Sequence, residues 1–137
     1  MCVAEPKTRP TGASVLAFLG AVEDQRRREE GFALLDLFGR VTGAPAAMWG
    51  PSIVGFGSMA HASSSGEAEW PVVGFSPRKA ALSLYGIHGD SGPHEPLLHE
   101  LGPHSLGKGC LYVKRLDRID AAVLGRLIAN AWSQARG

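Results

Sequence analysis

The sequence predicts an α+β fold: a single compact domain with an antiparallel sheet of about four strands and helices packed against it. Two observations predict this class. Apolar residues recur at helical spacing near both ends of the chain, and short strand-forming runs separated by Gly, Ser and Pro occupy the middle. Helices segregated from a run of strands are typical of α+β domains. The chain has 137 residues, about the size of one domain, so we expect no second one.

The N-terminal part predicts a tail followed by a first helix. Residues 1–12 combine prolines with small and charged residues, so we expect a flexible tail there and a domain over residues 13–137. Ser14 can cap the helix, because its side chain can accept a hydrogen bond from a free amide of the first turn. The apolar face of this helix comprises Val15, Phe18, Leu19 and Val22.

A second N-terminal helix is predicted after the charged segment 23–30, which we expect to be solvated. Its apolar stripe comprises Leu34, Leu35, Phe38 and Val41. Gly43 and Pro45 predict its end, since glycine adopts the left-handed conformation that closes helices and proline cannot continue one.

The middle of the chain predicts an antiparallel meander. Strands are expected at residues 53–56, 70–75, 81–85 and 109–115. In the last of these, alternation places Leu111 and Val113 on one side of the sheet, and Cys110, Tyr112 and Lys114 on the other.

Two further helices are predicted in the C-terminal half. A short one follows the loop 86–96 and contains Leu97, Leu98 and Leu101. The last one is opened by Asp117 or Asp120, and its buried face comprises Val123, Leu124, Leu127, Ile128 and Ala131.

Charge and composition exclude several classes of function. The net charge is +1, so no overall electrostatic attraction to nucleic acid is expected. No apolar run is long enough to span a membrane, and residues 1–7 lack an apolar signal segment, so we expect a cytoplasmic protein. The two cysteines do not make a disulfide framework.

Three glycine-rich motifs resemble known sites but lack their structural context. Residues 102–108 have phosphate-loop spacing, yet a strand rather than a helix is predicted after them. Residues 55–60 resemble a dinucleotide fingerprint, but no helix is predicted to begin there. Residues 89–93 resemble the nucleophile loop of chymotrypsin-like proteases, but the chain is too short for the two β-barrels of that fold. We interpret all three as turns.

A metal site is not predicted. His88, His94, His99 and His104 are spaced by five or six residues, whereas a shared helical face needs three or four. We therefore expect solvated histidines, no resident metal and no cofactor.

Basic and aromatic residues near the predicted strands form the candidate ligand-binding site. Arg78 and Lys79 follow a strand, and Lys108, Lys114 and Arg115 lie on or near another, so these cations would converge with Tyr85 and Tyr112 if the two strands are neighbours. The alternative is that they are ordinary exposed charges. Trp49 would mark a pocket if exposed and fill the core if buried. The predicted ligand-binding residues are Trp49, Ser52, Phe56, Ser76, Arg78, Lys79, Lys108, Cys110 and Tyr112.

Three blocks of the sequence also carry a resemblance to a known family. They are MWGPSIVGFG at residues 48–57, WPVVGFSPRK at 70–79 and GKGCLYVKRL at 107–116. Together they resemble the YdhG-like family of bacterial domains of unknown function, over about residues 8–135. The resemblance implies a compact α+β domain, and in one branch a frataxin-like iron chaperone. Frataxin-type binding uses an acidic ridge on the first helix, whereas residues 14–22 here carry no carboxylate.

Three functional hypotheses follow. The first is a cytosolic module that binds a small anionic ligand, with no catalytic residues and no nucleic-acid or membrane partner. The second is an iron-handling protein that uses residues 88–104 or the carboxylates of 23–30. The third is an enzyme with Cys110 as nucleophile, whose thiol pKa a neighbouring ammonium would lower; a buried, inert cysteine is the alternative. We favour a protein that is not an enzyme.

Overall fold

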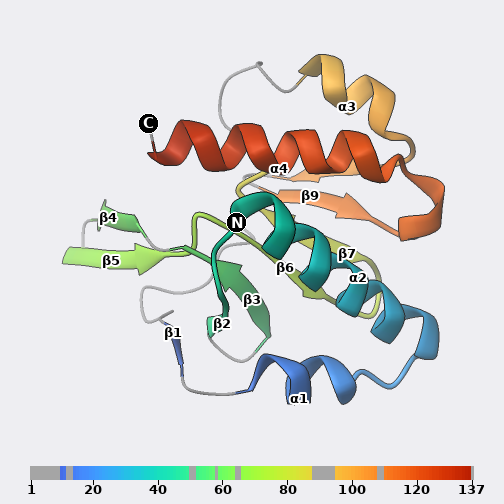
Figure 1. Cartoon of the computed structure of the whole chain (residues 1–137), viewed down its shortest axis with the longest axis horizontal. Helices are drawn as coiled ribbons and strands as arrows, with labels where there is room; N and C mark the ends of the chain where they lie inside the picture. The colour runs from blue at the N-terminus through green and yellow to red at the C-terminus, as the bar shows by residue number, and fades with distance from the viewer. Residues whose placement is uncertain are drawn as a thin grey trace.

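The computed structural model describes residues 10–11, 14–49, 52–57, 59–63, 66–87, 95–107 and 110–136. The helices are α1 (Val15–Gly20), α2 (Gln25–Thr42), α3 (Glu95–Leu101) and α4 (Ala121–Arg136), with a 3-10 turn η2 (Leu116–Arg118). The strands are β1 (Pro10–Thr11), β2 (Ala46–Trp49), β3 (Ile53–Phe56), β4 (Met59–Ser63), β5 (Gly66–Trp70), β6 (Val73–Pro77), β7 (Leu82–Tyr85), β8 (Ser105–Gly107) and β9 (Cys110–Val113). Figure 1 shows their arrangement.

The strands form a main sheet and a separate hairpin. Within the described residues the main sheet has seven strands in the order β1-β2-β3-β6-β7-β9-β8, and β4 pairs only with β5. Every neighbouring pair is antiparallel. The α+β class and the antiparallel sheet are therefore confirmed, whereas the expected number of about four strands is too low. The strands missed are short (β1, β8), rich in alanine (β2, β4) or mostly polar (β5).

The helices confirm the expected pattern of two N-terminal, one short and one C-terminal helix. Ser14 caps α1, since its Oγ accepts a hydrogen bond of 3.0 Å from the Ala17 amide. Gly43 ends α2 in the left-handed conformation at φ 70°. The charged segment 23–30 is not a solvated stretch between helices. Asp24 caps α2 there, accepting a bond of 2.8 Å from the Arg27 amide, and the first two turns of the helix follow.

All four described helices contribute to one core on one face of the sheet. Leu19 of α1, Phe38 of α2, Leu98 of α3 and Leu127 of α4 are buried together with sheet residues such as Leu111. In Figure 1, α2 crosses the central strands and α4 lies beside it. The described helices thus cover one face of the sheet.

The opposite face carries a second, smaller cluster to which no described helix contributes. It contains Trp49, Ile53, Tyr85 and Cys110, with Ala47 and Tyr112 packed against them. The alternation predicted for residues 109–115 is confirmed, because Leu111 and Val113 belong to the helix-covered core while Cys110 and Tyr112 belong to the second cluster. We call this second surface the helix-free face.

The predicted tail lies almost wholly outside the described residues. Its residues 10–11 form β1, which pairs with Met48 and Trp49 at one edge of the sheet. The other edge is β8, a strand of three residues. The short edge strand β8 lies beside the candidate site.

Candidate functional site

Four hydroxyl side chains lie in one row across the helix-free face. The strand register places Ser76 opposite Ser83, Ser83 opposite Tyr112, and Tyr112 opposite Ser105. Ser76 is 1% exposed and Ser83 is 3% exposed. Within the described part of the chain, no hydrogen bond reaches either serine hydroxyl. A buried hydroxyl without a partner costs about 1–3 kcal/mol, so Ser76 and Ser83 are placed at an energetic cost among the packed residues of this face.

Arg78 reaches the same face from the turn between β6 and β7. Its backbone amide donates 3.1 Å to the Ala81 carbonyl, which closes the turn. Its guanidinium Nη2 donates to the Tyr85 hydroxyl at 3.3 Å. A cation from this turn therefore does meet Tyr85, as the sequence predicts. Lys79, at the same turn, is exposed and makes no hydrogen bond or ion pair among the described residues.

Trp49 is buried rather than exposed. Only 1% of it is accessible, and its indole lies against the backbone of Gly55 on the neighbouring strand β3. A Cβ at Gly55 would clash with that ring, so glycine is required for the indole to lie flat on the sheet. Trp49 thus anchors the second cluster and is not an open pocket wall.

The remaining predicted residues are not all brought to this face. Phe56 lies on the helix-covered face, where its ring centroid is 5.5 Å from that of Phe38 and 6.5 Å from that of Phe75. Ser52 lies at the β2–β3 turn and is half-buried. Lys108 lies outside the described residues. Of the predicted set, Trp49, Ser76, Cys110 and Tyr112 share the helix-free face, and Arg78 reaches it.

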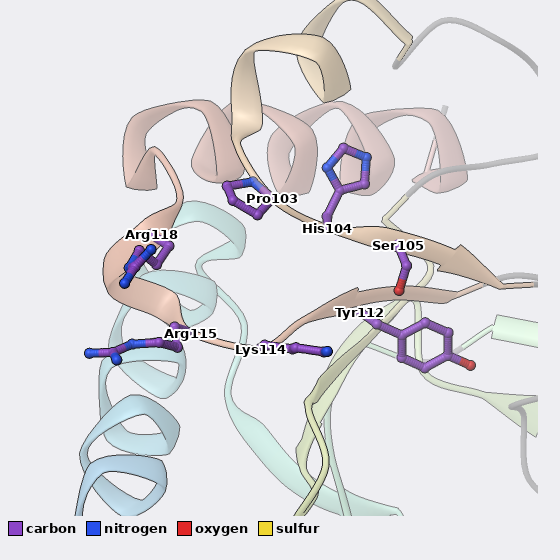
Figure 2. A pocket seen from close by; sticks show the side chains of 7 residues that line it. All are labelled: Pro103, His104, Ser105, Tyr112, Lys114, Arg115 and Arg118. Carbon is purple, nitrogen blue, oxygen red and sulfur yellow. The ribbon is translucent and has the colours of Figure 1, made fainter.

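A pocket of about 520 Å³ opens where β8 and β9 end (Figure 2). It is lined by Pro103, His104, Ser105, Tyr112, Lys114, Arg115 and Arg118. These residues come from the loop after α3, from β8 and β9, and from the turn that leads into η2. Tyr112 is the one residue shared with the predicted ligand-binding set. Lys114 and Arg115 belong to the basic group that the sequence singles out.

The pocket is electropositive. Arg115 donates two hydrogen bonds to Asp117, of 3.0 and 2.8 Å. That hydrogen bond lowers the pKa of the Asp117 carboxyl and raises the pKa of the Arg115 guanidinium. Among the described residues, neither Lys114 nor Arg118 forms an ion pair, and both are exposed. Arg115 is therefore matched by Asp117, whose charge also interacts with that of Arg118, while Lys114 and Arg118 remain outside any ion pair of the described residues.

The backbone of the pocket wall is held from behind by a buried ion pair of α2. Arg27 is 5% exposed and Glu30 is 7% exposed, and Arg27 Nη1 lies 2.9 Å from Glu30 Oε1. Arg27 also donates 3.2 Å to the Lys114 carbonyl, and Glu30 Oε2 accepts 2.8 Å from the Leu116 amide. The pair thus binds the backbone on both sides of Arg115, which orients the cationic segment.

The opposite wall depends on Gly102. This residue has φ +115°, and a Cβ there would lie 2.8 Å from the Arg118 carbonyl oxygen. Its own carbonyl accepts a bond of 2.7 Å from His104 Nδ1, so Nδ1 carries a proton and Nε2 is left for other contacts. Gly102 therefore lets the loop after α3 approach η2 closely enough to enclose the pocket.

The two other sequence hypotheses receive no support from these geometries. Cys110 is fully buried and disulfide-bonded, so it presents no free thiol; the other cysteine, Cys2, lies outside the described residues. Asp24 and Glu30 are engaged in capping and in the buried pair. No group of three or more His, Cys, Asp or Glu suited to a metal occurs among the described residues, which exclude His88 and His94.

No helix in the described ranges is long and apolar enough to cross a membrane. Comparison with models of protein families, with curated proteins and with solved structures finds no match for this chain. The resemblance to the YdhG-like family accordingly stays a prediction from the sequence.

Proposed function

We propose that the protein is a binding module for a small anionic molecule, and that the pocket beside β8 and β9 holds this ligand. The proposal rests on one observation. Two cations of this pocket, Lys114 and Arg118, form no ion pair with any described residue. A volume of about 520 Å³ lies within the range of roughly 300–1,000 Å³ that is usual for small-molecule sites.

The architecture around the pocket supports binding more than catalysis. The backbone on both sides of Arg115 is held by a buried pair, so the ordering that binding requires there is confined to side chains. The pocket's one histidine, His104, is tied through Nδ1 to a backbone carbonyl, and no described residue pairs with it as a nucleophile and base would.

Calorimetric titration with inorganic phosphate, sulfate and citrate tests the proposal. We expect saturable binding that weakens as salt is added, because exposed charges are screened. Lys114→Ala and Arg118→Ala should each weaken it about tenfold, since a charge-assisted hydrogen bond is lost.

An exposed cation that does not line the pocket serves as a matched control. Arg126→Ala removes the same charge and should leave the dissociation constants unchanged within error. Equal weakening by all three substitutions would mean that net charge, not the pocket, attracts the anions. Absence of saturable binding for every anion would refute the proposal.

A further inference from the structure

The pocket has two chemically different ends. Figure 2 shows Arg118 and Arg115 at one end, Tyr112 and Ser105 at the other, and the Lys114 side chain extending between them toward the tyrosine. A site for a simple inorganic anion needs only the cationic end. The end with Tyr112 and Ser105 is not needed to bind an inorganic anion, so it indicates a ligand with a second, uncharged part.

The net charge of the pocket lining matches a doubly charged group. Lys114, Arg115 and Arg118 supply three positive charges, and Asp117 removes one through its bonds to Arg115. A phosphomonoester carries roughly −1.5 to −2 at neutral pH, whereas a carboxylate carries only one negative charge. A phosphomonoester therefore complements the charge of the pocket lining better than a carboxylate does.

The aromatic end lies at a suitable distance for a ring attached to that phosphate. Tyr112 and Lys114 are two residues apart on one face of the chain, which is roughly 7 Å along a strand. Tyr112 is half-buried, and no hydrogen bond from the described residues reaches its hydroxyl. Its ring can stack on a flat ligand, and its hydroxyl and that of Ser105 can bind polar substituents.

We infer that the ligand is a ring-bearing phosphomonoester, with its phosphate against Lys114 and Arg118 and its ring against Tyr112. This inference rests on the proposed anion-binding function and names the class of ligand. The row continues beyond Tyr112 to Ser83 and Ser76, but these hydroxyls are 3% and 1% exposed and do not line the pocket, so the polar contacts of the ring are those to Tyr112 and Ser105.

Calorimetry with four probes tests the inference: inorganic phosphate, phenyl phosphate, benzoate and phenol. We expect phenyl phosphate to bind about tenfold more tightly than inorganic phosphate, because the ring adds a stacking contact. Benzoate should bind more weakly than phenyl phosphate, and phenol weakest of all.

Substitution of the tyrosine locates the added contact. Tyr112→Ala should reduce the advantage of phenyl phosphate over inorganic phosphate to less than about threefold, because the stacking contact is lost. Tyr112→Leu, which keeps apolar bulk in the second cluster, should also lose most of that advantage, so a folding defect of the alanine variant would not hide the result. Arg118→Ala should weaken both phosphates equally.

The outcomes separate this inference from the proposed function. Equal affinities for inorganic and phenyl phosphate in the native protein would overturn the inference while anion binding stands. A phenyl phosphate advantage that survives both Tyr112 substitutions would also overturn it. If no probe binds, the proposed function and the inference fall together.

Discussion

At the scale of single residues, Asp117 limits the charge of the pocket. Its carboxylate accepts both hydrogen bonds from Arg115, which leaves that guanidinium less free for a ligand. The hydrogen bond lowers the Asp117 pKa below its ordinary value of 3.8. A carboxyl with a lowered folded pKa contributes stability that is present above the unfolded pKa and is lost as the pH falls through the folded one.

Asp117→Asn should therefore tighten binding of inorganic phosphate severalfold at neutral pH, because Arg115 is released and a like charge is removed. In the native protein, the stability contributed by charged Asp117 is lost as the pH falls below about 4. The Asn variant should lack this pH-dependent loss, which we expect to be small because both side chains of the pair are exposed. Calorimetry and urea titrations at pH 3 and pH 7 measure the two effects. Weaker phosphate binding by the variant would show that Asp117 orients Arg115 toward the ligand instead.

At the scale of elements, the pocket depends on the approach of the loop after α3 to η2. The Asp120 amide donates 2.8 Å to the Leu101 carbonyl, and Gly102 follows with a positive φ that side chains rarely adopt. The sequence suggests a turn here because a glycine and a proline are adjacent, but the closeness of residues 102 and 118 is a tertiary contact that local patterns do not contain.

Gly102→Ala should destabilise the fold by about 1–3 kcal/mol, because the new Cβ would meet the Arg118 carbonyl in a strained backbone conformation. It should also weaken anion binding by widening the pocket. Gly39→Ala is the matched control: it lies in α2 with open space around it and should stabilise the protein by about 0.5–1 kcal/mol. Urea denaturation compares the two, and a Gly102→Ala variant as stable as the native chain would contradict the assignment.

At the scale of the whole molecule, the buried pair Arg27–Glu30 joins two distant parts of the chain. Its bonds to Lys114 and Leu116 span 87 and 86 residues. Removal of Glu30 would leave a buried guanidinium and an amide without their partner, and such a change is usually far more costly than loss of an exposed ion pair.

Glu30→Ala should therefore destabilise the protein by about 3–5 kcal/mol. Glu30→Gln keeps an oxygen that can accept from the Leu116 amide, so it should lose less stability. Glu29→Ala, an exposed neighbour on the same helix, should change the free energy of unfolding by under about 0.5 kcal/mol. Chemical denaturation measures all three, and similar values for Glu30→Ala and Glu29→Ala would show that the pair contributes little.

Sequence patterns predict the fold better than the site, for a physical reason. The helices with one apolar face, the Ser14 cap and the alternation at Cys110–Val113 are local signals, and the structure confirms them. All four residues of β3 are buried, so no polar alternation reveals which face Phe56 occupies, and the structure places it in the helix-covered core rather than beside Trp49 and Tyr112. His104 and Arg118 join the pocket only through tertiary packing, and no spacing in the sequence links them.

The hydrogen bonds from Arg27 and Glu30 of α2 to the segment after β9 also determine when the pocket forms. Contacts between residues more than eighty positions apart carry a large loop-closure cost, and they form only after intervening elements have condensed. During synthesis, α2 emerges long before its partners Lys114 and Leu116, so Arg27 and Glu30 stay solvated until nearly the whole domain has left the ribosome. The pocket is then among the last parts of the molecule to form, and a ligand that binds it would favour completion of folding.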